Sequence, residues 1–77
     1  MPLVEVTLLE GRSPETIRTL IESLSTATQT ALGVEIGSIT VVVHAVPPTH
    51  WATGNQTAAE RRLAISREDS QRAYENA

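Results

Sequence analysis

Apolar and polar residues alternate at the start of the chain. Over Leu3 to Leu9 every second side chain is apolar, at Val4, Val6 and Leu8, with Glu5 and Thr7 between them. This period of two is typical of a strand that buries one face. The sequence therefore predicts a first strand over residues 3–9, followed by a turn at residues 10–12.

A period of three to four residues follows the turn. Its apolar positions, which fall on one face of a helix about five turns long, are Ile17, Leu20, Ile21, Leu24, Ala27, Ala31 and Leu32. Ser13 suits the N-cap and Pro14 the first helical position, while Gly33 suits the left-handed residue that ends a helix. We therefore expect one long amphipathic helix between Ser13 and Gly33.

Residues 39–46 are mostly β-branched, and we interpret them as a second, more buried strand that ends at Pro47. A strand, a long crossover helix and a second strand require parallel strands joined by a right-handed connection. Residues 49–56 lack a helical period and indicate a short hairpin or loop. The predicted fold class is α+β: a single β-α-β unit with two parallel strands, one long helix and a short C-terminal hairpin.

The chain is small, with 77 residues, 40% of them apolar, one Trp, one Tyr and no Phe or Cys. A chain of this length buries a modest share of its surface, and without cysteine it has no disulfide or thiolate metal site to reinforce it. A two-stranded sheet with one helix is also too little to be stable alone. We therefore expect the β-α-β unit to assemble into oligomers in which sheets from several copies join.

The charge of the chain excludes some classes of partner. The chain has nine acidic residues, six arginines and no lysine, which gives a net charge of −3. Nucleic-acid-binding surfaces are basic. No apolar run approaches the roughly 20 residues of a membrane span, and the first residues do not form a signal peptide. Metal-ligand spacings, glycine-rich phosphate loops and nucleophile elbows are also absent from the sequence. We expect a cytoplasmic protein with no cofactor, no metal and no nucleic-acid or membrane partner.

Pro2 carries the most distinctive chemistry of the sequence. A small second residue normally allows Met1 to be removed, and this would convert an amide nitrogen into a basic secondary amine. The strand that follows would hold such an amine in place. If Met1 is retained, Pro2 remains an amide, and the alternative is a non-catalytic structural or ligand-binding oligomer.

Four features occur together: Pro2 before a strand, the turn sequence Leu9-Glu10-Gly11-Arg12-Ser13, one long helix, and His50-Trp51 followed by Thr53-Gly54. In combination they resemble the 4-oxalocrotonate tautomerase family, small β-α-β enzymes with an N-terminal catalytic proline. The resemblance covers Pro2 to Arg62. It implies a tautomerase-like domain over residues 1–62 and a C-terminal extension over residues 63–77, helical or partly disordered.

The resemblance implies a cofactor-independent isomerase of aromatic compound catabolism, built as a homohexamer from three dimers. Pro2 would be the general base that moves a proton between the enol oxygen and a carbon of a small 2-hydroxy-dienoate or 2-oxo acid. Arg12 would bind a substrate carboxylate, and Trp51 would stand in place of the family's active-site aromatic. Both would favour the neutral amine, through positive charge and an apolar wall. A related hydratase, dehalogenase or decarboxylase is the alternative within the superfamily.

Thr40 departs from the family pattern, because well-known members carry a second substrate-binding arginine at this position. A threonine hydroxyl has no charge and makes no bidentate contact with a carboxylate, which puts the usual dicarboxylate substrate in doubt. Arg61 and Arg62 either supply the missing charge from another subunit or lie on a solvated helix.

Plainer interpretations remain open for several of these residues. Arg12 is alternatively a surface arginine without a partner, and Trp51 an interface aromatic. We expect His44 to face a subunit contact and His50 to lie in a turn. Neither is favoured as an acid or base, because the sequence places no carboxylate at a useful spacing from either imidazole.

Overall fold

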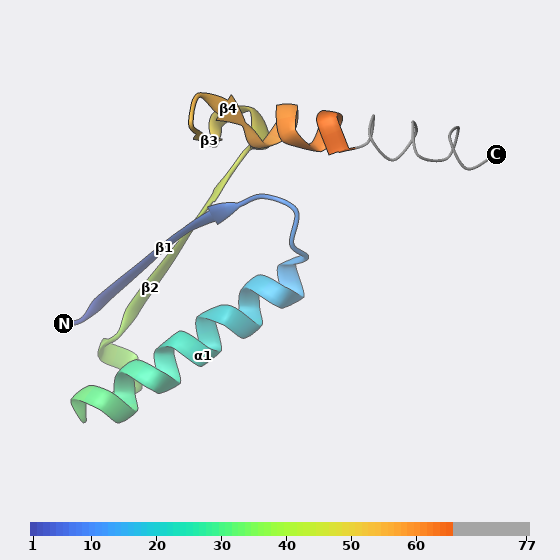
Figure 1. Cartoon of the computed structure of the whole chain (residues 1–77). Coiled ribbons are helices and arrows are strands. Elements are labelled where there is room, and N and C mark those ends of the chain that lie inside the picture. The colour runs from blue at the N-terminus through green and yellow to red at the C-terminus, as the bar shows by residue number, and fades with distance from the viewer. Residues whose placement is uncertain (66–77) are drawn as a thin grey trace. The chain divides into compact units, whose positions relative to one another are not determined.

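A computed structural model describes residues 1–65 of the chain (Figure 1). The chain divides into two compact units, Met1–Ala45 and Val46–Ala77. The first contains the strands and the long helix, and the described part of the second contains a hairpin and a shorter helix.

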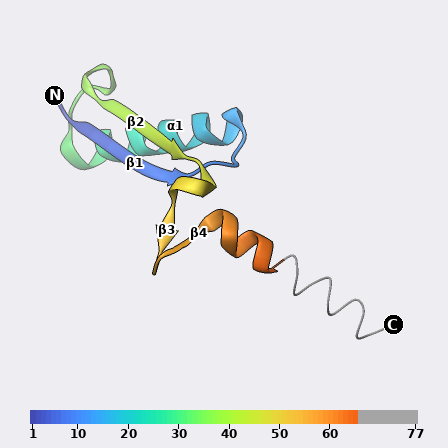
Figure 2. The same ribbon diagram turned by 90° about the horizontal axis from the view of Figure 1, so that it is seen from above.

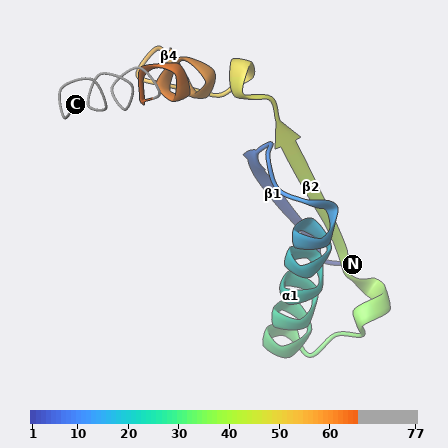
Figure 3. The same cartoon turned by 90° about the vertical axis from the view of Figure 1, so that its right-hand side faces the viewer.

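The first unit is the predicted β-α-β element. Its parts are β1 (Leu3–Leu9), α1 (Pro14–Leu32), the 3₁₀ helix η1 (Ile36–Ser38) and β2 (Thr40–Val46). The strands form a two-stranded parallel sheet (Figure 2). In Figure 3, α1 lies alongside both strands, and the chain returns through η1 to the start of β2. The fold class and the bounds of β1 are confirmed, and β2 begins one residue later than predicted because the N–H of Ile39 still bonds to Ile36 in η1.

The ends of α1 have the chemistry that the sequence predicts. The Ser13 hydroxyl accepts the N–H of Thr16 at 3.2 Å, and Pro14 occupies the first helical turn. Gly33 adopts φ 66°, and its N–H donates to the carbonyl of Gln29 at 2.8 Å. Both ends of the helix are therefore set locally, by a side-chain cap and by a left-handed glycine.

The helix presents only part of its apolar face to the sheet. The half-buried apolar residues of α1 are Ile17, Leu20, Ile21 and Leu24. The remaining members of the predicted face, Ala27, Ala31 and Leu32, are exposed. The seven-residue strands span about 23 Å at roughly 3.3 Å per residue, which is shorter than the roughly 28 Å of a 19-residue helix, so they do not cover α1 along its whole length.

No residue among 1–65 is fully buried in the single chain. On β1 the residues toward the helix are half-buried, while Leu3 remains 57% exposed. Within the first unit nothing covers the face opposite α1, which contains Leu3, Glu5 and Thr7 of β1 and, by alternation along β2, Thr40, Val42 and His44. The first unit thus has apolar surface on both sides of its sheet and lacks a core of its own.

The second unit begins with the 3₁₀ helix η2 (Pro48–His50) and the predicted hairpin, formed by β3 (Ala52–Thr53) and β4 (Gln56–Thr57). The strands are antiparallel, with Ala52 opposite Thr57 and Thr53 opposite Gln56. Gly54 and Asn55 have φ of 60° and 65°, and two positive φ values are what a type I′ turn requires.

A helix follows the hairpin over residues 58–65. Thr57 caps it, because its hydroxyl oxygen accepts the N–H of Glu60 at 3.1 Å and also bonds to the Glu60 carboxylate at 3.0 Å. The helix begins ahead of residue 63, where the predicted extension starts, and most of that extension lies outside the described residues. Within residues 1–65, no helix is long and apolar enough to cross a bilayer, and no three acidic, histidine or cysteine side chains gather as metal ligands.

Candidate active site

Pro2 is fastened to the sheet by its backbone. It lies directly before β1, and its carbonyl oxygen accepts the N–H of Thr40 at 3.0 Å. The Pro2 side chain is half-buried, whereas Met1 is 99% exposed. A proline amine at this position would therefore be fixed in place and remain accessible from the side that Met1 occupies.

Thr40 is the sequence-predicted site residue that the structure places beside Pro2. Their backbone hydrogen bond joins the first residue of β2 to the residue preceding β1. Thr40 is exposed, so its side chain is not committed to a packed interior. The backbone of Thr40, where the resemblance implies a second arginine, is thus next to that of Pro2.

Arg12 lies at the other end of β1. The seven residues of the strand and then Glu10 and Gly11 separate it from Pro2, and the strand alone spans about 23 Å at roughly 3.3 Å per residue. In Figure 1 the N-terminus and the turn from β1 to α1 are at opposite ends of the strand. A single chain does not bring Arg12 to Pro2.

The Arg12 side chain is held by the turn that it follows. Gly11 has φ 129°, a conformation that side-chain-bearing residues rarely adopt, and the Arg12 Nη1 donates to the Leu9 carbonyl at 2.9 Å. This contact leaves the guanidinium edge formed by Nε and Nη2 free. Two parallel N–H groups on one edge match the geometry of a carboxylate.

Trp51 belongs to the second unit, between η2 and β3. Its side chain is half-buried, and its carbonyl oxygen accepts the N–H of Ala58 at 2.8 Å. That bond ties the base of the hairpin to the first turn of the helix over residues 58–65. His50, in η2 as the expected turn residue, is exposed, and its N–H donates to the Pro47 carbonyl at 2.9 Å.

Arg61 makes contacts that were not predicted. Its Nη2 donates to the Thr53 carbonyl at 3.2 Å, and its Nε donates to Oε1 of Gln56 at 3.3 Å. The guanidinium is therefore held against the hairpin and is not simply solvated. Local patterns gave no sign of this, because the acceptors lie five and eight positions earlier, across a turn. Arg62 makes no hydrogen bond to any residue within 1–65.

His44 lies near a carboxylate that the sequence did not reveal. The Nε2 of His44 lies 4.0 Å from Oε2 of Glu5 on the neighbouring strand, with the two side chains 51% and 58% exposed. The pair forms across the sheet, so spacing along the sequence does not reveal it. It sits four residues along β2 from Thr40, on the face opposite α1.

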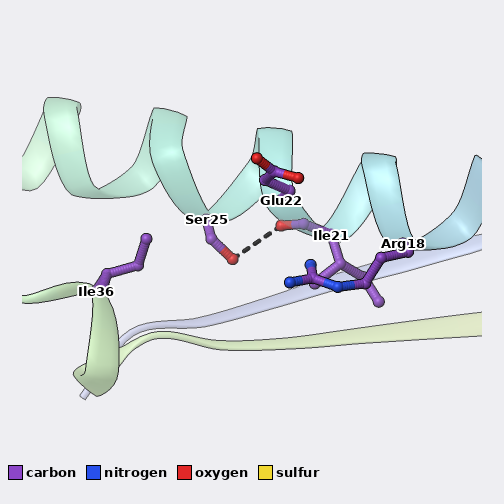
Figure 4. Close-up of a pocket in the computed structure, with 5 residues that line it drawn as sticks. All are labelled: Arg18, Ile21, Glu22, Ser25 and Ile36. Carbon is purple, nitrogen blue, oxygen red and sulfur yellow. Dashed lines mark hydrogen bonds between the residues drawn. The ribbon is translucent and has the colours of Figure 1, made fainter.

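A separate open pocket of about 440 Å³ lies between α1 and η1 (Figure 4). Its lining residues are Arg18, Ile21, Glu22, Ser25 and Ile36. The Ser25 hydroxyl donates to the Ile21 carbonyl at 2.8 Å and is thereby occupied. The pocket contains none of the sequence-predicted site residues.

Comparison with known proteins identifies the family. Residues 2–61 match the sequence profile of the family described as "Tautomerase enzyme". The chain is 45% identical over 51 residues to a protein of Ralstonia nicotianae named as a probable tautomerase, covering 66% of this chain and 73% of that protein. It is 34% identical over 58 residues to the 2-hydroxymuconate tautomerase of Stutzerimonas stutzeri, covering 75% and 92% of the two chains.

Solved structures agree with these matches. TomN, a 4-oxalocrotonate tautomerase homologue of the tomaymycin biosynthetic pathway, superposes with a TM-score of 0.77 at 44% identity, over 80% of this chain and 95% of TomN. A heterohexameric 4-oxalocrotonate tautomerase from Chloroflexus aurantiacus superposes with a TM-score of 0.74 at 40% identity, over 78% and 97%. The chain therefore belongs to the 4-oxalocrotonate tautomerase family of the tautomerase superfamily.

Proposed function

We propose that the protein is a cofactor-independent tautomerase acting on a small 2-hydroxy-dienoate or 2-oxo acid, with the Pro2 amine as its general base. The observation that supports this most directly is the position of Pro2 in a chain of the tautomerase family. Pro2 directly precedes β1, and its carbonyl oxygen accepts the backbone N–H of Thr40 at 3.0 Å. Removal of Met1 would expose the amine at this fixed point.

The reaction requires only one proton to move. The amine of Pro2 takes the proton from the enol hydroxyl, and the oxygen–hydrogen electron pair becomes part of the new carbonyl. The carbon–carbon double bonds shift along the substrate, and a carbon accepts the proton back from the Pro2 ammonium. No electrons are gained or lost, so neither an oxidant nor a reductant is needed. A general base of this kind works best when its pKa is close to the working pH.

Two residues would keep the amine neutral and hold the substrate. A guanidinium near the amine lowers the pKa of the amine by repelling its protonated form, and an apolar wall lowers it by desolvation. We assign the first effect to Arg12 and the second to Trp51. Arg12 also offers its free Nε and Nη2 edge to a substrate carboxylate, while its Nη1 stays on the Leu9 carbonyl.

The length of β1 requires more than one chain in such a site. β1, which lies between Pro2 and Arg12, is about 23 Å long at roughly 3.3 Å per residue, longer than a small diacid can span. We therefore propose that Arg12 comes from a neighbouring subunit of an oligomer, a homohexamer by family resemblance. The absence of any fully buried residue among residues 1–65 supports assembly.

Subunit complementation tests this proposal. Pro2→Ala and Arg12→Ala chains should each be nearly inactive toward an enol such as phenylenolpyruvate. If the site is shared, co-assembly of equal amounts should restore roughly a quarter of wild-type activity, because random mixing in a symmetric oligomer leaves that share of sites intact. Mixed oligomers that remain as inactive as the separate variants would contradict a site shared between chains.

A further inference from the structure

Arg61 is held so that one edge of its guanidinium remains available. Its two contacts use Nε, toward Gln56, and Nη2, toward the Thr53 carbonyl, and these atoms form one edge of the group. Arginine has five N–H donors in a planar arrangement. The opposite edge, formed by Nη1 and the second Nη2 hydrogen, keeps two parallel donors that can bind a carboxylate bidentately.

Arg12 and Arg61 share this arrangement. Arg12 is anchored through Nη1 to the carbonyl of Leu9, the last residue of β1, and Arg61 is anchored to the carbonyl of Thr53, the last residue of β3. Each side chain thus has a fixed guanidinium and a free two-donor edge. Arg18 and Arg62 have no such anchor within residues 1–65. Anchoring before the ligand arrives reduces the side-chain entropy that binding would otherwise remove.

The charge of Arg61 is not neutralised within residues 1–65, where the single ion pair is that of His44 and Glu5. The neighbouring carboxylate, Glu60, is bonded to the hydroxyl of Thr57, where it belongs to the helix cap. The cation is therefore free to attract an anion from outside this part of the chain.

Arg61 also belongs to the same structural piece as Trp51. The N–H of Ala58 donates to the Trp51 carbonyl, and Arg61 lies one helical turn after Ala58 on the same side of the helix. The hairpin between them provides both acceptors of the guanidinium. The hairpin and the helix that follows it therefore hold Trp51 and Arg61 in one structural element.

We propose that Arg61 is a specificity-determining residue that binds a second substrate carboxylate, in place of the charge that Thr40 lacks. The inference rests on the proposed function, which puts Trp51 in the wall of the site. It predicts that the substrate is a dicarboxylate, one end of which Arg61 holds. Without Arg61 the site would hold only one end of such a diacid.

Binding of two matched, unreactive acids tests this inference without requiring turnover. Muconate and sorbate share a six-carbon chain with two conjugated double bonds. Muconate carries two carboxylates and sorbate carries one, and neither has an enol proton to transfer. Trp51, the sole tryptophan of the chain, provides the fluorescence signal. Wild type should bind muconate at least about tenfold more tightly than sorbate, on the scale expected for a charged hydrogen-bonded pair.

Arg61→Gln should remove this preference by weakening muconate alone, while Arg62→Gln, the matched control on the next residue, should keep it. The inference is overturned if wild type shows no preference, if Arg61→Gln retains the preference, or if Arg61→Gln weakens both acids equally. A protein that binds muconate selectively but converts no enol acid would refute the proposed function and leave the role of Arg61 intact.

A second pair of variants keeps the test valid if Arg61→Gln fails to fold. Ala64 is exposed on the helix, one turn beyond Arg61. Glu at this position would engage the free guanidinium edge and compete with the ligand while the hairpin contacts remain. Ala64→Glu should therefore weaken muconate binding and spare sorbate, and Ala64→Gln should change neither. Equal muconate affinity in these two variants would contradict the inference.

Discussion

The backbone N–H of Thr40 donates to the carbonyl oxygen of Pro2 at 3.0 Å, which holds the start of β2 beside the residue proposed as the base. The Thr40 backbone is therefore next to Pro2 within one chain, and the Thr40 side chain is exposed. Because the contact is made by the backbone of Thr40, its side chain can be exchanged without removing the bond that fixes Pro2.

Installing an arginine at this position should restore a second anion contact when Arg61 is absent. In the Arg61→Gln background, Thr40→Arg should raise kcat/KM for 2-hydroxymuconate at least about tenfold over that for a monocarboxylate enol of similar shape, because a guanidinium binds carboxylate bidentately. Steady-state kinetics with both substrates measures this ratio. Thr40→Gln is the uncharged control. An unchanged ratio in Thr40→Arg would mean that position 40 lies outside the pocket.

Loss of the proline ring should impair proton transfer. Pro2→Ala should lower turnover of phenylenolpyruvate by at least about 10²-fold, the usual contribution of a positioned general base. In wild type, kcat/KM should fall as the pH is lowered, because protonation of the amine removes its ability to accept a proton. Turnover assays across pH check both statements. Wild-type rates in a correctly processed Pro2→Ala enzyme would exclude Pro2 from the mechanism.

Gly11 should be hard to replace although it has space around it. A side chain there meets no atom within 4 Å, but φ is 129°. Gly11→Ala should therefore cost about 1–3 kcal/mol through backbone strain alone. Gly37→Ala is the matched control, since Gly37 is equally open and lies outside this φ range. Urea unfolding at one fixed protein concentration compares them, and equal stabilities would refute the strain argument.

The isolated chain should not persist as a folded monomer. Residues 1–65 contain no fully buried side chain, and Leu3 and Leu32 are 57% and 60% exposed. Sedimentation velocity at micromolar concentration should show an oligomer, a hexamer by family resemblance. A monomer that melts cooperatively would contradict this expectation.

Local chemistry was enough to predict the elements of the fold. Alternation defined β1, Ser13 and Gly33 marked the ends of α1, and the missing helical period of residues 49–56 indicated the hairpin or loop. Each of these signals acts within a few residues, through side-chain period, capping or positive φ.

Contacts between elements were not predictable in the same way. The approach of His44 to Glu5 depends on the register of two strands, and the approach of Arg61 to Thr53 depends on how a helix leaves a hairpin. Neither follows from spacing along the chain. The backbone contact between Pro2 and Thr40 likewise depends on the pairing of β1 with β2. The family resemblance had pointed to both residues but not to this contact.

The state of Met1 tests the central claim most directly, since a retained methionine leaves Pro2 as an amide that cannot accept a proton. Preparations with different proportions of chains lacking Met1, measured by intact-mass spectrometry, should be assayed for turnover of the same enol. Specific activity should rise in proportion to the fraction of chains that begin at Pro2. Full activity in protein that retains Met1 would contradict the assignment of the Pro2 amine as the base.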